Sequence, residues 1–231
     1  MKKIAFIPVI LLITAAWVYS GDIFFPVKKG MVQLTANFNS NNKIEGFSRL
    51  TVKDVVSSGS DITVIYSIQI LDKNRKPSGK SGEREYSINI SDGVLMYRLD
   101  NMMDAFFSAR DMKYTIASGD FPIPSDIIPG MAIEDTWMKM TVSVPIIGTV
   151  TADTAITNIV CTGIETITVA AGTFEAYKVT QTSTTKTTGW GRSPIISTTA
   201  VWYAKGIGLV KSVSYNAKGK TESSSELYEI E

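Results

Sequence analysis

The stretch TITVAAGTFEAYKV, residues 166–179, places a turn of small residues between two runs that alternate as β-strands do. Strand-like residues end at Val169, and Gly172 is available for the positive φ that a tight reversal needs. After the turn, alternate side chains again share one face of a returning strand. The stretch therefore predicts a β-hairpin in which Gly172 and Thr173 form the turn.

The same two-residue rhythm recurs along most of the chain. In DITVIYSIQIL, residues 61–71, both faces are partly apolar, which indicates a strand covered on both sides, by a helix or by a ligand. The GIG segment joins two further runs, so Gly206 and Gly208 are predicted to form a turn and not a dinucleotide-binding loop. Nine or more strands separated by polar turns predict a mainly β, antiparallel fold.

One stretch departs from this rhythm and predicts a helix. In RLDNMMDAFFSARDM, residues 98–112, Asp100 or Asn101 can cap a short amphipathic helix, because its apolar residues recur at spacings of three and four. Such a face either packs on the sheet or lines an apolar groove, since methionine adapts to irregular shapes. The candidate groove or core residues are Met102, Met103, Phe106 and Phe107.

Prolines mark the stretch ASGDFPIPSDIIPGMAIEDTW, residues 117–137. Because proline has no N–H group for a sheet ladder, we expect a loop that crosses between sheet regions instead of a strand. The composition does not change on either side of this stretch. Residues 21–231 are therefore predicted to form a single β-rich domain.

The composition restricts the chemistry available to this chain. Histidine is absent and Cys161 is the single cysteine, which excludes a Ser-His or Cys-His nucleophile, a structural zinc site and an intrachain disulfide. We predict no metal and no cofactor. Acid-base candidates are the carboxylates around the proline-rich stretch, although charged residues beside a loop are usually only solvated. These candidates are Asp120, Asp126, Glu134 and Asp135.

Residues 1–20 have the layout of a secretory signal peptide, with Lys2 and Lys3 before an apolar run. The uncharged run that ends at Gly21 only just reaches the roughly 18 residues that a spanning helix needs. Cleavage after Ser20 is therefore favoured over a retained anchor, and no transmembrane span is expected after cleavage. The remainder carries one more acidic than basic residue, which predicts no nucleic-acid partner. The expected location is the periplasm or the cell surface.

Four motifs are spread over nearly all of residues 21–231: FPVKKG from Phe25, PSDIIPG from Pro124, E-x3-VAAGTF-x-AYK from Glu165 and WYA-x-G-x-GLVK from Trp202. Together they resemble those of the TapB-like exported proteins, relatives of a domain-of-unknown-function group of bacterial cell-envelope proteins. The resemblance implies a strongly curved antiparallel sheet, a half-barrel or open barrel similar to lipoprotein carriers, with one short helix across the concave face. It implies no established enzyme activity. Several relatives look like lipoproteins, whereas this chain has no cysteine near the cleavage site.

Three functions follow from these observations, in order of preference. The first is a non-catalytic envelope protein that binds a lipid, an acyl chain or a partner segment in the concavity of the sheet. The second is an assembly component that presents loops or sheet edges to other envelope proteins. The third is a carboxylate-dependent hydrolase that acts on cell-wall glycan.

Overall fold

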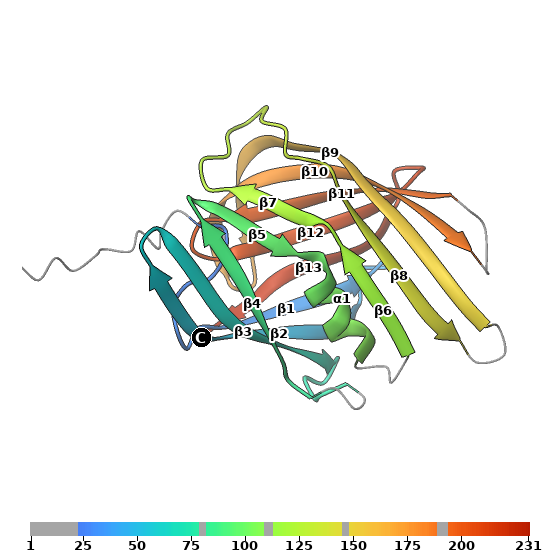
Figure 1. Ribbon diagram of the computed structural model, residues 1–231, viewed down its shortest axis with the longest axis horizontal. Helices are drawn as coiled ribbons and strands as arrows, with labels where there is room; N and C mark the ends of the chain where they lie inside the picture. The colour runs from blue at the N-terminus through green and yellow to red at the C-terminus, as the bar shows by residue number, and fades with distance from the viewer. Residues whose placement is uncertain (1–22, 79–81, 109–112, 145–147, 189–193) are drawn as a thin grey trace, which may run out of the picture.

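β-Strands make up most of the chain in this computed structural model, which describes residues 23–78, 82–108, 113–144, 148–188 and 194–231 (Figure 1). A single helix, α1 (Leu99–Ser108), interrupts them in the described residues. The strands are β1 (Val32–Asn39), β2 (Ile44–Ser58), β3 (Asp61–Asp72), β4 (Arg84–Ser91), β5 (Val94–Arg98), β6 (Lys113–Ser118), β7 (Asp120–Pro124), β8 (Thr136–Val144), β9 (Gly148–Val169), β10 (Gly172–Thr188), β11 (Ile195–Ala204), β12 (Gly208–Asn216) and β13 (Thr221–Ile230). The mainly β fold predicted from sequence is confirmed.

All strands belong to one thirteen-stranded sheet in the order β6-β8-β9-β10-β11-β12-β13-β1-β2-β3-β4-β5-β7. Each neighbouring pair is antiparallel, and most pairs are consecutive hairpins. Strong curvature brings the two ends of this order together in Figure 1. The predicted curved sheet thus rolls into a barrel that is nearly closed.

The closing segment is one extended stretch, residues 113–124, that changes partner at Gly119. Before the glycine, β6 pairs with β8, so that Ile116 lies opposite Met140. After it, β7 pairs with β5, so that Ile123 lies opposite Leu95. The two terminal strands of the sheet, β6 and β7, are consecutive in the chain, so this stretch joins both edges of the sheet. Each of these strands pairs on one side only, and we call the line along their other sides the seam.

The expectation that residues 117–137 contain no strand is wrong for residues 120–124, which form β7, and at both ends of the stretch, where residues 117–118 belong to β6 and residues 136–137 to β8. Pro122 and Pro124 lie in this strand and face Met96 and Val94 of β5. The physical reason is that β7 is a terminal strand with one ladder only, which is where a sheet tolerates a residue without an N–H group.

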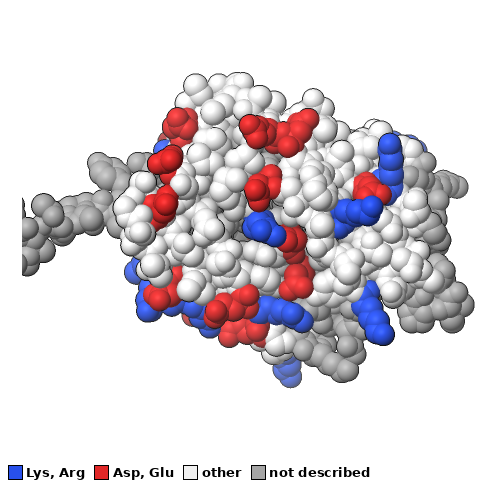
Figure 2. Space-filling view, in the orientation of Figure 1, with Lys and Arg blue, Asp and Glu red and all other residues white. Residues whose placement is uncertain are grey.

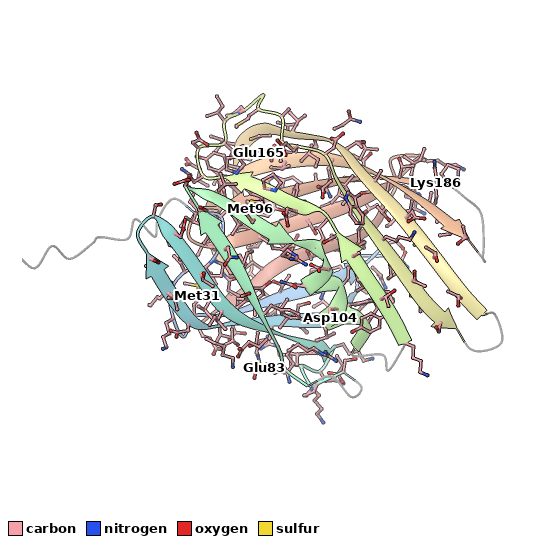
Figure 3. The ribbon with its side chains drawn as sticks, in the orientation of Figure 1. Met31, Glu83, Met96, Asp104, Glu165 and Lys186 are labelled. Carbon is pink, nitrogen blue, oxygen red and sulfur yellow. The ribbon has the colours of Figure 1, made fainter. Side chains whose placement is uncertain are left out.

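Helix α1 lies at the seam beside β6 and also contacts β3. Asp104 holds it there, because its carboxylate accepts hydrogen bonds from the Tyr86 hydroxyl of β4 at 2.8 Å and the Tyr114 hydroxyl of β6 at 2.7 Å. Figure 3 labels Asp104 between these strands. The Asp104 carboxylate therefore links β4 and β6 across the seam beside α1.

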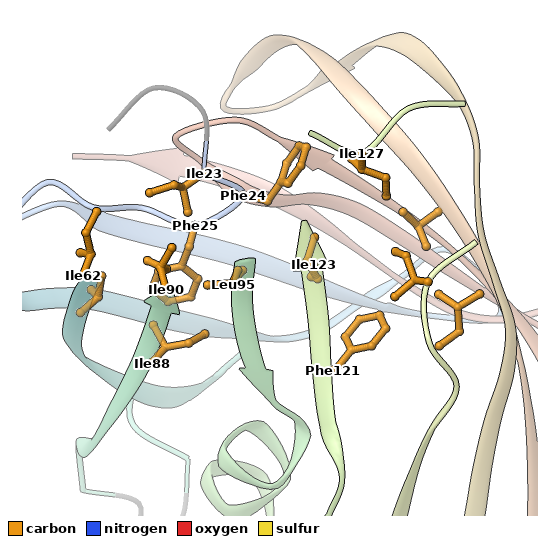
Figure 4. Packing of buried hydrophobic residues seen from close by; sticks show 14 of the residues in the cluster. Ile23, Phe24, Phe25, Ile62, Ile88, Ile90, Leu95, Phe121, Ile123 and Ile127 are labelled. Carbon is orange, nitrogen blue, oxygen red and sulfur yellow. The ribbon is translucent and has the colours of Figure 1, made fainter. Parts of the chain in front are cut away.

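The main hydrophobic core fills one half of the barrel interior, where residues 23–25 enter it (Figure 4). Phe24 packs edge-on against Tyr177 with ring centroids 5.0 Å apart, and Phe25 packs against Tyr66 at 5.1 Å. The β11–β12 turn fixes this segment, since the Gly206 N–H donates to the Ile23 carbonyl at 2.6 Å. We call residues 23–26 the N-terminal plug.

Candidate functional site

A cavity of about 310 Å³ occupies the barrel interior beyond the N-terminal plug. Its volume lies at the lower end of the roughly 300–1,000 Å³ that small-molecule sites span. In the part of the chain that the structure describes, its lining contains no Asp, Glu, Lys or Arg. The wall is formed by Phe24, Phe25, Pro26, Gln33, Thr35, Asn37, Ser48, Leu50, Ile68, Ile70, Tyr97, Leu99, Phe121, Thr136, Ile156, Gln181, Thr199, Val201, Tyr203, Ile207, Gly208, Leu209, Ser212 and Ser225.

One wall of the cavity carries a continuous row of neutral polar side chains across six neighbouring strands, β10 to β13 and then β1 and β2. Gln181 lies opposite Thr199 in the β10–β11 register. The Ser212 and Ser225 hydroxyls are hydrogen-bonded at 2.7 Å, and the Asn37 amide donates to the Ser48 hydroxyl at 3.2 Å. We call this row the polar belt; it consists of Gln181, Thr199, Ser212, Ser225, Asn37 and Ser48.

In the strands that carry the polar belt, polar side chains face the interior and apolar side chains face outward, which is the reverse of a barrel with a filled core. In β1, Gln33, Thr35 and Asn37 face the cavity, whereas Leu34 and Ala36 alternate to the outer face. There they are buried with Phe47 and Leu71 in a separate apolar cluster. The inner face therefore offers hydrogen-bonding groups where a core would place aliphatic ones.

Other residues shield these outward apolar clusters from water. The Arg75 guanidinium lies over the rings of Phe47 and Tyr228, 5.3 and 5.1 Å from their centroids. On β11, Ala200 and Trp202 form another outer cluster with Ala176. Because the outer face has its own packing, the inner polar face does not result from a lack of apolar residues in these strands.

The opposite wall is apolar and comes from β2, β3, β5, β7, β9 and α1. It includes Ile68, Ile70 and Phe121. Tyr97 and Tyr203 also line the cavity, and burial raises the pKa of both phenols well above the ordinary value of 10.0. Both hydroxyls therefore stay neutral at physiological pH, and the described lining residues are all uncharged.

Thr136, the first residue of β8, is a polar residue on the otherwise apolar wall, on the side of the seam. Its side chain is only 6% exposed, and its hydroxyl oxygen has no hydrogen-bond partner among the described residues. Gly119 lies against it, since a Cβ added there would stand 2.9 Å from the Thr136 hydroxyl oxygen. A buried hydroxyl without a partner at a cavity wall is suited to bind a polar group of a ligand.

The four helix residues chosen from sequence belong to α1, and the three with described side chains, Met103, Phe106 and Phe107, are not among the lining residues of the cavity. Phe107 is buried, with its ring 5.4 Å from that of Phe106 and 5.7 Å from that of Tyr114. Met103 is half-buried, and the side chain of Met102 lies outside the described part of the structure. Leu99 is the α1 residue at the cavity wall. A groove role for the four remains a prediction.

The glycines chosen from sequence lie in turns or directly after them. The turn of the predicted hairpin is formed by residues 170–171, whereas Gly172, with φ of 142°, and Thr173, which pairs with Thr168, are the first two residues of β10. Gly206 has φ of 73° in the β11–β12 turn, and Gly208 begins β12 with φ of 89°. A Cβ on Gly208 would lie 3.3 Å from the Phe24 carbonyl oxygen, so this turn also makes room for the N-terminal plug.

The four candidate acid-base carboxylates lie on the exterior. Asp120, Asp126, Glu134 and Asp135 are all exposed, and none lines the cavity. The described residues hold no group of three or more Cys, Asp or Glu side chains placed to bind a metal ion. On the face drawn in Figure 2, acidic and basic side chains are interspersed over the described surface. In the same described ranges, no helix is long and apolar enough to cross a membrane.

None of the polar-belt residues was among the site residues chosen from sequence. A signal was present, because VQLTANF in β1 alternates polar and apolar residues over seven positions. Such alternation predicts a strand with two unlike faces, yet it does not tell which face points inward. In a barrel with a filled core the apolar face of a strand points inward, whereas in β1 the apolar face points outward and the polar face lines the cavity.

Two solved structures share this fold. A Bacteroides fragilis protein, described provisionally as exported and as having a YmcC-like fold, superposes with a TM-score of 0.74 at 19% identity, over 90% of this chain and 99% of that one. A Parabacteroides distasonis protein, described provisionally as a lipoprotein, gives a TM-score of 0.75 at 17% identity, over 90% and 98% of the two chains. No curated protein matches the sequence. The DUF3108-like family model matches residues 28–227. The chain, with its plugged barrel and neutral cavity, belongs to the DUF3108-like family.

Proposed function

We propose that this protein is a non-catalytic, exported protein of the cell envelope that binds a hydrophobic ligand inside its barrel. The observation that carries the proposal is the uncharged cavity of about 310 Å³, with an apolar wall opposite the polar belt. Ligand sites in proteins are mostly apolar, with a few polar groups that fix orientation. The cavity has this composition.

The inversion of β1 and β11 supports binding over simple packing. A barrel stabilised only by its core would direct Leu34 and Trp202 inward, because burying apolar side chains is the main stabilising contribution to folding. In this protein both side chains are buried on the outer face instead. The interior polar groups then remain available to a ligand.

Export is supported by the basic residues and apolar run within residues 1–20, which lie outside the described residues. The provisional descriptions of the two structural neighbours as exported protein and lipoprotein agree with it. Within the family, kinship with the TapB-like proteins rests on the four motifs and remains a prediction. We also propose that residues 21–231 form a single domain.

A pair of variants on β11 tests ligand binding. Thr199 lines the cavity, whereas its neighbour Thr198 is exposed on the other face of the strand. We expect Thr199→Phe to fill the cavity and to reduce uptake of a fluorescent acyl probe at least about tenfold, while Thr198→Phe leaves uptake unchanged. Circular dichroism of both variants checks the fold. Equal uptake by the two variants, or no uptake by the unmodified protein, would contradict the proposal.

An assembly role is the second candidate, and exposed apolar residues at one end of β11 favour it. Ile195 and Ile196 are 51% and 45% exposed. Ile195→Ser together with Ile196→Ser would abolish co-purification of a stoichiometric envelope partner, if this role is correct, without changing uptake of the acyl probe. Co-purification that survives both substitutions argues against this surface.

A further inference from the structure

The cavity lining restricts the charge of any ligand that enters it. An ionised group buried without a counterion is strongly disfavoured, so proteins pair buried charges. Among the residues that the structure describes, no lining residue is acidic or basic. A carboxylate or phosphate placed in the cavity would therefore find no cation among these residues to pair with it.

Two lysines on the belt strands point outward and are paired with carboxylates. On the outer face, Lys178 pairs with Glu165 at 3.0 Å, and Lys211 pairs with Glu226 at 2.8 Å. At the other end, Lys205 lies over the rings of Phe24 and Tyr177, at 6.0 and 5.6 Å from their centroids, and is not part of the lining. These positions leave hydroxyls and amides as the polar groups at the wall.

The same groups have capacity to bind a neutral polar head. Serine and threonine hydroxyls both donate and accept, and a side-chain amide offers two donors and an acceptor. In the belt, the Ser212 and Ser225 hydroxyls use one hydrogen bond between them. The Thr136 hydroxyl is buried, in a residue that is 6% exposed, and has no partner among the described residues.

We infer that the ligand is an uncharged amphiphile with a single acyl chain, whose chain lies on the Ile68, Ile70 and Phe121 wall while its neutral hydroxyl or ester groups bind the polar belt and Thr136. This inference rests on the proposed function and names its ligand class. The small volume fits one chain better than two.

A matched pair of ligands tests the inference. Monolaurin and laurate share one acyl chain and differ in the head, which is a neutral glycerol ester in the first and a carboxylate in the second. At pH 8 we expect the purified protein to bind monolaurin at least about tenfold more tightly than laurate, measured by displacement of a fluorescent acyl probe. Lowering the pH should strengthen laurate binding selectively, because protonation removes its charge.

The outcomes separate this inference from the proposed function. If the protein does not take up the fluorescent probe and binds neither monolaurin nor laurate, the proposed function fails and the inference fails with it. If laurate binds as tightly as monolaurin, the proposed binding of a hydrophobic ligand inside the barrel stands, but the inference that this ligand is uncharged is overturned. Preference for monolaurin supports both.

Two substitutions with matched controls sharpen the test. Gln181→Lys places a cation at the wall and should shift preference toward laurate, whereas Thr182→Lys adds the same charge on the other face and should not. Thr199→Val removes one belt hydroxyl with little change of shape and should weaken monolaurin binding more than laurate binding. If Gln181→Lys fails to fold, by circular dichroism, the Thr199→Val result decides. An unchanged preference in Thr199→Val, or in a folded Gln181→Lys, contradicts the inference.

Discussion

Glu165 is the residue that joins the β9–β10 hairpin to β11. Its carboxylate accepts a hydrogen bond from the Trp202 indole N–H at 2.8 Å and pairs with Lys178 at 3.0 Å. The Lys178 ammonium also lies 5.0 Å from the centroid of the Trp202 ring. Below the ring, Ala176 is fully buried, so a larger side chain there would displace the indole. Two of the sequence motifs thus meet in one outward-facing cluster, which Figure 3 locates by its label on Glu165.

We predict that Glu165→Ala lowers the free energy of unfolding by about 1 kcal/mol at pH 7, because it leaves the indole N–H and the ammonium without their acceptor at a partly exposed site. The hydrogen bond from Trp202, followed by that from Lys178, lowers the pKa of Glu165 from 4.5. A lowered folded-state pKa stabilises the protein above the unfolded value, so the difference between variant and unmodified protein should shrink as pH falls below 4.5. Urea unfolding at several pH values measures it. Glu175→Ala on the exposed face of β10 is the control, and a similar loss there would contradict the assignment.

At the scale of elements, the seam is held by α1 and by the change of partner at Gly119. A terminal strand exposes unpaired backbone groups, and proteins commonly cover such edges. Here α1 covers β6 below Gly119. Above it, residues 130–133 run along β9, where the Ile133 N–H donates to the Ile159 carbonyl at 2.8 Å and the Cys161 N–H to the Met131 carbonyl at 2.9 Å. The seam thus lies where the two terminal strands of the sheet order, β6 and β7, meet, and α1 and residues 130–133 pack along it.

Removing the link at the seam should loosen this part of the barrel first. We predict that Asp104→Ala costs about 1–3 kcal/mol, because the hydroxyls of Tyr86 and Tyr114 lose their shared acceptor. Hydrogen exchange should accelerate in β6 and leave β12 unchanged. The pKa of Tyr86, raised first by burial and then by Asp104, should move down toward 10.0 in the variant. Asp153→Ala, at an exposed pair with Lys139, is the control. Uniform acceleration across all strands would contradict a local role.

At the scale of the whole molecule, the barrel is divided into two halves with different interiors. One half is filled by the N-terminal plug and by aliphatic residues such as Ile88, Ile90 and Leu95, which are nearly inaccessible. The other half holds the neutral cavity. Stability therefore resides mainly in the filled half and in the outer clusters, and the cavity half is free to be specialised for a ligand.

One buried and three partly buried tyrosines give this arrangement a characteristic response to alkali. Burial raises the pKa of Tyr66, Tyr86, Tyr97 and Tyr203 above 10.0. Above pH 10 the unfolded chain loses these protons while the folded protein keeps them, so the free energy of unfolding should fall steadily as pH rises beyond 10. Urea midpoints at pH 8 to 11, an interval of about three units around that value, would show the fall. Tyr97→Phe should reduce its slope, and a flat profile would contradict the burial of these phenols.

Before the structure was known, alternation and turn residues already indicated most of the fold. The runs at 61–71 and 166–179 appear as β3 and as the β9–β10 hairpin, and the predicted helix within 98–112 appears as α1. These are local features, since period-two patterning and helical spacing depend on neighbours in the chain. The exception is β7, whose prolines are acceptable only because the strand lies at a sheet end.

The site was decided by tertiary structure alone. In β3, alternation identified Ile62 to Ile70 as one face, yet only the rolled sheet shows Ile62 in the filled core and Ile70 at the cavity. In β1, alternation separated Gln33 from Leu34 but gave no means to decide which points inward. A strand pattern is symmetric between its two faces, and the direction of sheet curvature, which depends on all strands together, breaks that symmetry. The sequence by itself therefore determined an exported-type, antiparallel β protein without histidine chemistry, and the closure of the barrel determined that its described interior is neutral and partly polar.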